Sequence, residues 1–327
     1  MITSAALLSG CVSTQMGRIG ADDGSDPCRA QVVALDSTGD FFGEDIIRGA
    51  AVGALGGAAL GALIAAASGG NSRNIAAGAG IGALAGGLTG AAAGYYSARQ
   101  RQASDQASLN MAIANDLSLE NAQLDRTQLA FNQLMDCRFG TAQRIRTAYR
   151  NGQMTRPQAE AQLANQRALA QRDVQLAQSI NGRITSRGDQ FDVAIENVAP
   201  GTKQQVQAGA RVSAPQPLQA RAAVPLKLRP DAASPEVAQV SPRESVTVTP
   251  AGGGFALVET SAGVRGYAPA SAFPEVRNTA ARVQPAANDN DVRSLAATNI
   301  ARRDNFTESV SNAQRLAQGQ GFELAAS

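Results

Sequence analysis

Apolar residues recur at helical spacing along the middle of the chain, between residue 104 and about residue 184. The first series is Ile113, Leu117, Leu124, Phe131, Met135, Ala142, Ile145 and Tyr149, and the second is Ala159, Leu163, Leu169, Val174, Ala177 and Ile180. Between them, Asn151-Gly152 is typical of a helix end, and Thr155 with Pro157 is typical of a helix start. Because the join is short, the pattern predicts an antiparallel helical hairpin over residues 104–190.

The apolar stripe of this hairpin is narrow and rich in Ala and Gln, which favours coiled-coil-like packing. The first helix would extend roughly 65–70 Å, so one interpretation is a long spacer. A small intramolecular bundle is an equal alternative. Arg144, Arg146 and Arg150 are interpreted as a solvated face. Glu120 and Glu160 have no partner acid in the pattern, so no glycosidase-type carboxylate pair is predicted.

Glycine recurs at every fourth position in two registers ahead of the hairpin. These glycines are Gly49, Gly53, Gly57, Gly61, Gly78, Gly82, Gly86, Gly90 and Gly94, with a polar break at residues 68–74. A glycine inside a helix costs about 1 kcal/mol relative to alanine, so a compensating interaction is needed. Small residues four apart form a groove that lets a neighbouring helix approach closely. We therefore predict a glycine-zipper helical hairpin over residues 45–96, and the alternative is a flexible Ala/Gly linker.

The length and flanking charges of this glycine-rich hairpin suit a lipid bilayer. Each helix would be about 33 Å long, which is enough to cross the hydrocarbon core. Arg48, Arg73, Arg99 and Arg101 lie at its margins. Large aliphatic residues are sparse, so the helices are weak stop-transfer signals. The stretch resembles the glycine-zipper domain of small bacterial envelope lipoproteins, including the rickettsial 17 kDa surface antigen family, which implies membrane association and self-assembly.

The amino terminus resembles a bacterial lipoprotein signal. A short apolar run leads to Leu8-Ser9-Gly10-Cys11, which is similar to the lipobox. The resemblance implies that Cys11 is diacylated, and Val12 after it favours the outer membrane. The alternative is an incidental buried cysteine. Residues 1–11 are interpreted as the lipoprotein signal, and residues 12–44 as a segment that leads into the glycine-rich hairpin.

The other two cysteines, Cys28 and Cys137, lie in similar contexts, Asp26-Pro27-Cys28-Arg29 and Asp136-Cys137-Arg138. In an exported protein they would meet an oxidising compartment, where a disulfide is permitted. A bridge would tie the leading segment to the middle of the helical region. Two unpaired thiols are an equal alternative.

The period changes to that of short strands over residues 219–275. Five strands are predicted at residues 224–230, 237–240, 245–249, 255–259 and 264–269, separated by Pro- and Gly-rich turns, which favours a five-stranded barrel. The stretches 226–230, 255–258 and 266–273 resemble strands of the bacterial SH3 domain, with Phe255 and Tyr267 where the family has tryptophan. The resemblance implies binding to peptidoglycan or a proline-containing segment, with Arg229, Phe255 and Tyr267 as candidates, although core packing is the stronger interpretation for Phe255.

Two further segments complete the predicted organisation. Residues 191–218 are rich in proline towards their end and are interpreted as a linker. Residues 276–327 are polar, with a weak helical stretch near residues 304–316. They are interpreted as a mobile tail, and the alternative is a docking helix.

The composition excludes several kinds of chemistry. The chain has no His and no Trp, three Cys, 4 % aromatic residues and a net charge of +2. Without histidine, Ser-His and Cys-His nucleophile pairs and the usual zinc sites are excluded. The small net charge gives no nucleic-acid footprint. We therefore expect no enzyme activity, no cofactor and no metal.

Together these features predict an α plus small β protein with a structural role. It would be an outer-membrane lipoprotein facing the periplasm, in contact with the lipid bilayer and with peptidoglycan or an envelope protein, and self-associating through its helical hairpins. One alternative is an oligomeric pore formed by the glycine-rich hairpins. Another is an accessory subunit that positions a cell-wall hydrolase.

Overall fold

The computed structural model describes residues 15–42, 91–210, 215–251, 254–274 and 291–324. Two long antiparallel helices, α5 (Gln106–Arg150) and α6 (Arg156–Val198), form the centre of the fold. The Asp105 side chain caps α5 by accepting from the Ser108 amide. Helix α6 begins after Thr155, whose backbone amide donates to Gln158 Oε1 at 2.9 Å, and Pro157 lies in its first turn. The predicted hairpin is thus confirmed, and α6 runs past its predicted end at residue 190.

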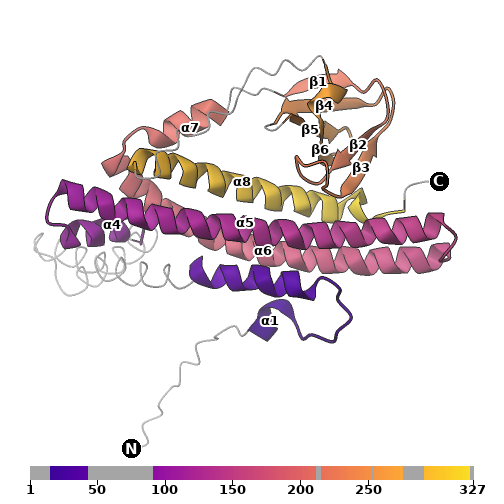
Figure 1. Cartoon of the computed structure of the whole chain (residues 1–327), viewed down its shortest axis with the longest axis horizontal. Coiled ribbons are helices and arrows are strands. Elements are labelled where there is room, and N and C mark those ends of the chain that lie inside the picture. The colour runs from indigo at the N-terminus through magenta and orange to yellow at the C-terminus, as the bar shows by residue number, and fades with distance from the viewer. Residues whose placement is uncertain (1–14, 43–90, 211–214, 252–253, 275–290, 325–327) are drawn as a thin grey trace, which may run out of the picture.

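A third long helix, α8 (Val292–Gln318), lies along both arms of the hairpin (Figure 1). It buries Ile300, Phe306, Val310 and Leu316, and the Phe306 ring meets Phe131 of α5 edge-on at 5.7 Å between centroids. The mobile tail predicted over residues 276–327 is therefore wrong for residues 291–324. The structure shows the docking-helix alternative, because the apolar stripe of α8 is buried mainly against α5 and α6 of the hairpin.

A helix over residues 29–42 covers the opposite side of the hairpin from α8 (Figure 1). Its own side chains Leu35 and Phe42 are fully buried. The helix approaches α6 closely at Gly39, where a Cβ atom would lie 2.8 Å from Ile180 Cγ1. The hairpin is therefore the centre of an intramolecular bundle, which was one of the two alternatives left open by its sequence.

The linker predicted over residues 191–218 is largely regular structure. Phe191, Ala194 and Ile195 continue the buried stripe of α6 to Val198, and α7 (Thr202–Ala210) follows after Gly201, which has a positive φ of 77°. The strand β1 (Gln216–Gln219) comes next. Pro200 thus ends a helix, and Pro217 lies in an edge strand, where a missing backbone N–H is tolerated.

The carboxy-terminal half carries an antiparallel sheet of six strands. After β1 come β2 (Val224–Lys227), β3 (Glu236–Val240), β4 (Ser245–Pro250), β5 (Phe255–Thr260) and β6 (Arg265–Pro269), in the spatial order β1-β4-β5-β6-β2-β3. The five predicted strands are present within a few residues, and β1 is an addition. A short 3-10 turn, η2 (Ala270–Ala272), follows β6. The chain is therefore mixed α and β, with an open six-stranded sheet among its described residues.

One face of the sheet is its core. Leu226, Val248, Val258 and Ala268 are fully buried there and come from four different strands. Gly266 is required at this face, because a Cβ atom would lie 2.7 Å from Leu226 Cβ. Side chains at alternate positions point to the other face, as the period of two predicts.

The carboxy-terminal turn η3 (Gln320–Phe322) packs against α5, α6 and α8 and also contacts β3 of the sheet. The Phe322 ring stacks on Phe139 at 4.8 Å, and Arg146 donates to the carbonyl oxygens of Gly321 (2.7 Å) and Glu323 (2.8 Å). Burial lowers the pKa of the Arg146 guanidinium. The interpretation of Arg146 as part of a solvated face, together with Arg144 and Arg150, is therefore wrong for Arg146, because the chain end packs over it.

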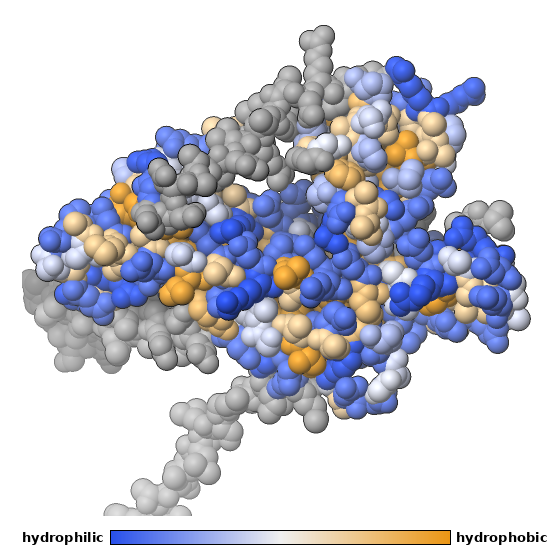
Figure 2. Space-filling model, in the orientation of Figure 1, coloured by the Kyte–Doolittle hydropathy of each residue, from blue (hydrophilic) through white to orange (hydrophobic). Residues whose placement is uncertain are grey.

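The surface of the bundle that Figure 2 shows is mostly hydrophilic, with separate apolar patches. The large apolar side chains that are exposed include Met111 and Leu119, both more than 60 % exposed. Among the described residues, no helix combines the length and hydropathy needed to cross a membrane.

Candidate functional site

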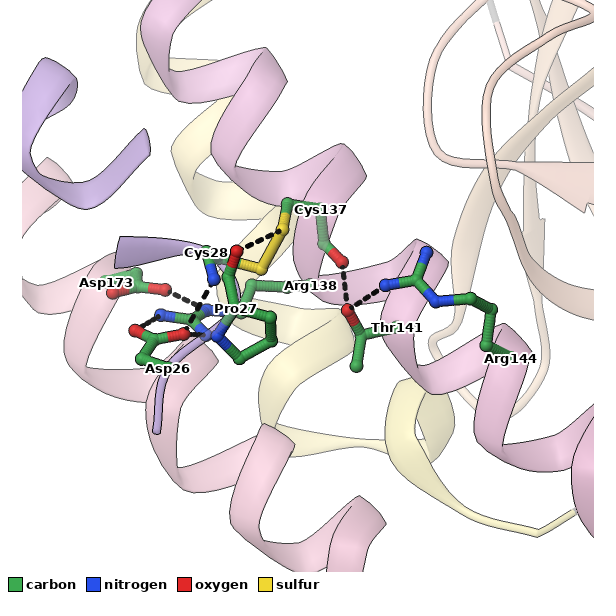
Figure 3. The surroundings of a disulfide bond; sticks show 8 residues. All are labelled: Asp26, Pro27, Cys28, Cys137, Arg138, Thr141, Arg144 and Asp173. Carbon is green, nitrogen blue, oxygen red and sulfur yellow. Dashed lines mark hydrogen bonds and ion pairs between the residues drawn. A yellow bond between two sulfur atoms is a disulfide. The ribbon is translucent and has the colours of Figure 1, made fainter. Parts of the chain in front are cut away.

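A covalent cross-connection lies at one turn of α5. Cys137 forms a disulfide with Cys28, with their Cα atoms 5.8 Å apart (Figure 3). The structure thus resolves the two alternatives for these cysteines in favour of the bridge. The bridge fixes the start of helix 29–42 to the middle of α5, and the two cysteines are 109 positions apart in the sequence.

Arg138, the next residue, is fully buried between two carboxylates. Its Nη1 and Nη2 donate to the two oxygens of Asp26 at 2.5 and 2.7 Å, and its Nε donates to Asp173 of α6 at 2.6 Å (Figure 3). One guanidinium can donate to both carboxylates at once because its N–H groups point outward in a planar fork. The residue therefore ties the leading segment to both arms of the hairpin.

The two carboxylates differ in the balance between burial and pairing. Burial raises the pKa of Asp173 above its ordinary value and outweighs the opposite effect of Arg138. For Asp26, burial also acts to raise the pKa, but hydrogen bonds from Arg138 and from the Cys28 amide outweigh it, so that the pKa is lowered. Asp26 therefore favours its charged form in the folded state, whereas Asp173 depends on Arg138 to stay charged.

A second buried ion pair lies nearer the amino-terminal end of α5. Glu120, 1 % exposed, accepts hydrogen bonds from Arg187 of α6 through both carboxylate oxygens. The Arg187 guanidinium carbon lies 4.8 Å from the Phe41 ring centroid and 5.9 Å from that of Phe191. The acid that had no partner acid in the sequence pattern is thus held by a cation from the facing helix. Glu160, the other such acid, forms an exposed pair with Arg156.

Helix α4 (Ala91–Gln102) docks at the same end of the bundle. Its Tyr95 hydroxyl donates to Asp116 at 2.6 Å, and Arg99 donates to both oxygens of Asp116 at 2.7 Å. The Tyr95 ring also lies 5.1 Å from that of Phe191. Burial, and next the Asp116 carboxylate, raise the pKa of the Tyr95 hydroxyl.

The chain ahead of Cys28 folds back toward this end as well. In the short helix α1 (Gln15–Ile19), Arg18 donates to both oxygens of Asp36 at 2.7 and 2.8 Å, and it lies 3.2 Å from Asp40. Asp40 is next to Phe41, which contacts Arg187. We call the region around Glu120, Arg187 and Phe191 the Phe191 end of the bundle. Phe42 and Tyr95, which lie on either side of residues 43–90 in the sequence, both contact this end of the bundle.

Replacing Asp116 with asparagine is expected to loosen α4 with little effect elsewhere. The variant loses a partly exposed ion pair with Arg99, which is worth about 1 kcal/mol at most. Hydrogen exchange of the α4 amides should then accelerate up to about fivefold. The matched control is Asp125→Asn on the same helix, which pairs with Arg302 of α8 instead. Equal exchange in α4 for both variants would contradict the assignment.

The residues predicted to carry function are distributed as follows. Cys11 and the glycines from Gly49 to Gly90 lie outside the described residues, whereas Gly94 lies half-buried in α4. Phe255 and Tyr267 lie half-buried on the face of the sheet opposite its core, in the pairs Phe255–Pro269 and Leu257–Tyr267. Phe255 therefore is not a core residue of the sheet, because its position in β5 alternates with the buried ones.

Arg229 has a different position from the one expected of a ligand-binding residue. Its guanidinium pairs with Asp136 of α5, with Nε 3.2 Å from the carboxylate oxygen. The arginine therefore fastens the sheet to the bundle. A separate shallow hollow of about 450 Å³ lies at β1, β4 and β5, lined by residues that include Pro217, Thr247 and Glu259.

Nothing in the described part of the chain resembles a metal site. No group of three or more His, Cys, Asp or Glu side chains there could hold an ion. The acids that are buried, such as Glu120 and Asp173, are paired with arginine. These buried ion pairs hold separate elements of the chain together.

Comparisons with protein-family models, with curated proteins and with solved structures found no match for this chain.

Proposed function

We propose that this chain is a structural, lipid-anchored protein of the bacterial outer membrane, which holds an SH3-like module against the cell wall or an envelope protein. The observation that carries the proposal is the convergence at the Phe191 end. Phe41 and Phe42 stand at one limit of residues 43–90 and Tyr95 stands near the other, and all three contact Arg187 or Phe191. A segment that leaves and returns at one place suits a hairpin inserted into a bilayer.

The position of α1 supports two membrane attachments on the same side. Gln15, the first described residue, is four positions after Cys11, and Arg18 is fixed near Asp40. A lipid on Cys11 would therefore enter the bilayer near the place where residues 43–90 begin. Acyl chains contribute about 0.8 kcal/mol per buried CH₂, so that lipid and hairpin together would anchor the protein firmly.

The disulfide supports export from the cytoplasm. Bridges such as Cys28–Cys137 persist in oxidising compartments, of which the bacterial periplasm is one. The bridge also lies within the chain that follows Cys11. A periplasmic bundle attached to the outer membrane is consistent with both features.

The binding module in this proposal is the sheet, with Phe255, Leu257 and Tyr267 on its outer face. These side chains are half-buried and adjacent in β5 and β6, so their rings can stack on a sugar or a proline. Lys227 pairs with Tyr267 across β2 and β6 on the same face. Arg229 has no part in this surface, because it is engaged with Asp136.

The anchoring half of the proposal is tested with the full-length protein in cells. Palmitate labelling and outer-membrane fractionation of the native protein are compared with those of Cys11→Ala and of Gly82→Leu/Gly86→Leu. We expect the first variant to lose the label, and the second to keep the label but to extract more easily at high pH. A labelled Cys11→Ala protein, or unlabelled native protein, would rule out the lipid anchor.

The binding half is tested by sedimentation of the purified protein with isolated sacculi. Tyr267→Ala is expected to weaken binding several-fold, since an aromatic contact is worth about 0.5–1.5 kcal/mol beyond its buried area. Ser261→Ala, in the exposed turn after β5, is the matched control. Equal binding by both variants would exclude this face, and dye release from liposomes without sacculus binding would favour the pore.

A further inference from the structure

Three consecutive residues of α5 contact three different parts of the molecule. Asp136 pairs with Arg229 of the sheet, Cys137 is bonded to Cys28 of the leading segment, and Arg138 pairs with Asp173 of α6. Successive side chains on a helix point about 100° apart, so one turn can reach three neighbours on different sides. We call residues 136–138 the α5 joint.

The disulfide at the joint closes a covalent loop. The loop contains helix 29–42, residues 43–90, α4 and α5 up to Cys137, and its ends are separated by 109 positions in the chain. A pull on the chain ahead of Cys28 therefore passes directly to Cys137. Once the Arg18 contacts with Asp36 and Asp40 have opened, the covalent loop bears none of this tension, because its two ends are held together.

On the other side of α5, the same turn holds the sheet. Asp136 pairs with Arg229, which lies just after β2, and β3 also packs against α5. In Figure 1 the sheet and helix 29–42 lie on opposite sides of the hairpin. The shortest path from the leading segment to the sheet thus crosses the bundle at the joint and does not follow the length of α5.

We propose that the α5 joint carries tension between an anchor ahead of Cys28 and a ligand held by the sheet, and that the disulfide keeps this tension away from residues 43–90. The proposal rests on the proposed function for the nature of the anchor and ligand. It also replaces the interpretation of the hairpin as a lengthwise spacer. A membrane hairpin within residues 43–90 would then not be pulled from the bilayer by a load on the lipid.

The test is single-molecule pulling of the full mature chain in detergent micelles. One handle is placed at the amino terminus of a Cys11→Ser chain, and the other is an azide residue at Ser261, in the exposed turn between β5 and β6. In the oxidised protein, release of the sheet should be the first event after α1 has come away from helix 29–42. The variant Cys28→Ala/Cys137→Ala should first release chain from the loop, up to roughly 370 Å at about 3.4 Å per residue.

Two controls make each outcome decisive. Native protein reduced after folding should behave as the double alanine variant does, which covers the case in which that variant folds poorly. Arg229→Gln should lower the force of sheet release and leave the loop unaffected. The proposal is overturned if loss of the bridge releases no additional length before the sheet, or if Arg229→Gln leaves the release force unchanged.

The pulling experiment needs neither a bilayer nor a cell wall. The joint can therefore fail while the lipid anchor and sacculus binding are upheld, and it can be upheld where they fail. A result for the joint is thus separate from a result for the proposed function.

Discussion

Replacing Cys28 and Cys137 together with alanine is expected to lower the free energy of unfolding by about 4 kcal/mol. The bridge closes a loop of 109 positions, for which the chain-entropy account gives about 4.7 kcal/mol, and removal of a native disulfide typically costs about 2–5 kcal/mol. Alanine is preferred to serine because Cys28 is fully buried, and a serine there would bury a hydroxyl. Urea unfolding followed by circular dichroism at 222 nm measures the change.

The oxidised native protein and the same protein under reducing agent are the controls for the alanine pair. Reduction should produce most of the same loss, since it opens the loop without changing the packing. A loss below about 1 kcal/mol in both cases would mean that the ion pairs around Arg138 already hold the leading segment in the unbridged protein. The bridge would then contribute little to the folded state.

The hairpin could be predicted from the sequence because its signals are local. The Thr155 cap, Pro157 in the first turn and the apolar stripe all act within a few residues of where they occur. The strands were predicted for the same reason, since alternation along β5 and β6 depends on neighbouring positions. Among the six strands, β1 is the one that the sequence does not predict, because Pro217 indicates a linker.

Helix α8 was the element whose role the sequence left open. Its buried stripe includes Asn299 and Asn312 beside apolar residues, so that the helical pattern is interrupted by polar positions. Asn299 is fully buried and donates to Asn121 of α5 at 3.1 Å. A buried amide whose NH₂ group donates to a partner so distant in the chain cannot be distinguished from a solvated one by local spacing.

The joint was visible in the sequence only as two similar contexts around Cys28 and Cys137. Asp26 and Asp173 meet at Arg138 from separations of 112 and 35 positions. The family resemblance assigned Arg229 to a ligand, whereas its actual partner is Asp136, one residue before the bridged cysteine. Long-range pairing of this kind depends on the assembled bundle.

The second large effect is expected for Arg138→Met, which should destabilise the protein by about 3–5 kcal/mol. Methionine fills a similar volume, but it leaves Asp173, only 6 % exposed, without its cation. The matched control is Arg144→Met on the same helix, where the exposed arginine donates to a nearby hydroxyl, Thr141 Oγ1, at 2.8 Å. That variant should change stability by less than about 0.5 kcal/mol. Equal losses of stability for the two variants would show that the buried ion pairs of Arg138 with Asp26 and Asp173 do not stabilise the fold.

The pH dependence of this loss of stability distinguishes the ion pairs of Arg138 from simple apolar packing. In the native protein Asp26 has a lowered pKa, so its contribution to stability is present above the ordinary aspartate pKa and is lost as the pH falls through its own lower value. In Arg138→Met the unpaired carboxylates favour protonation, and a neutral acid needs no cation. The difference in unfolding free energy between native protein and variant should therefore shrink as the pH falls from 7 through about 4. A difference that stays constant over this range would show that the lost contacts are apolar, whereas one that shrinks identifies the charges of Asp26 and Asp173 as its source.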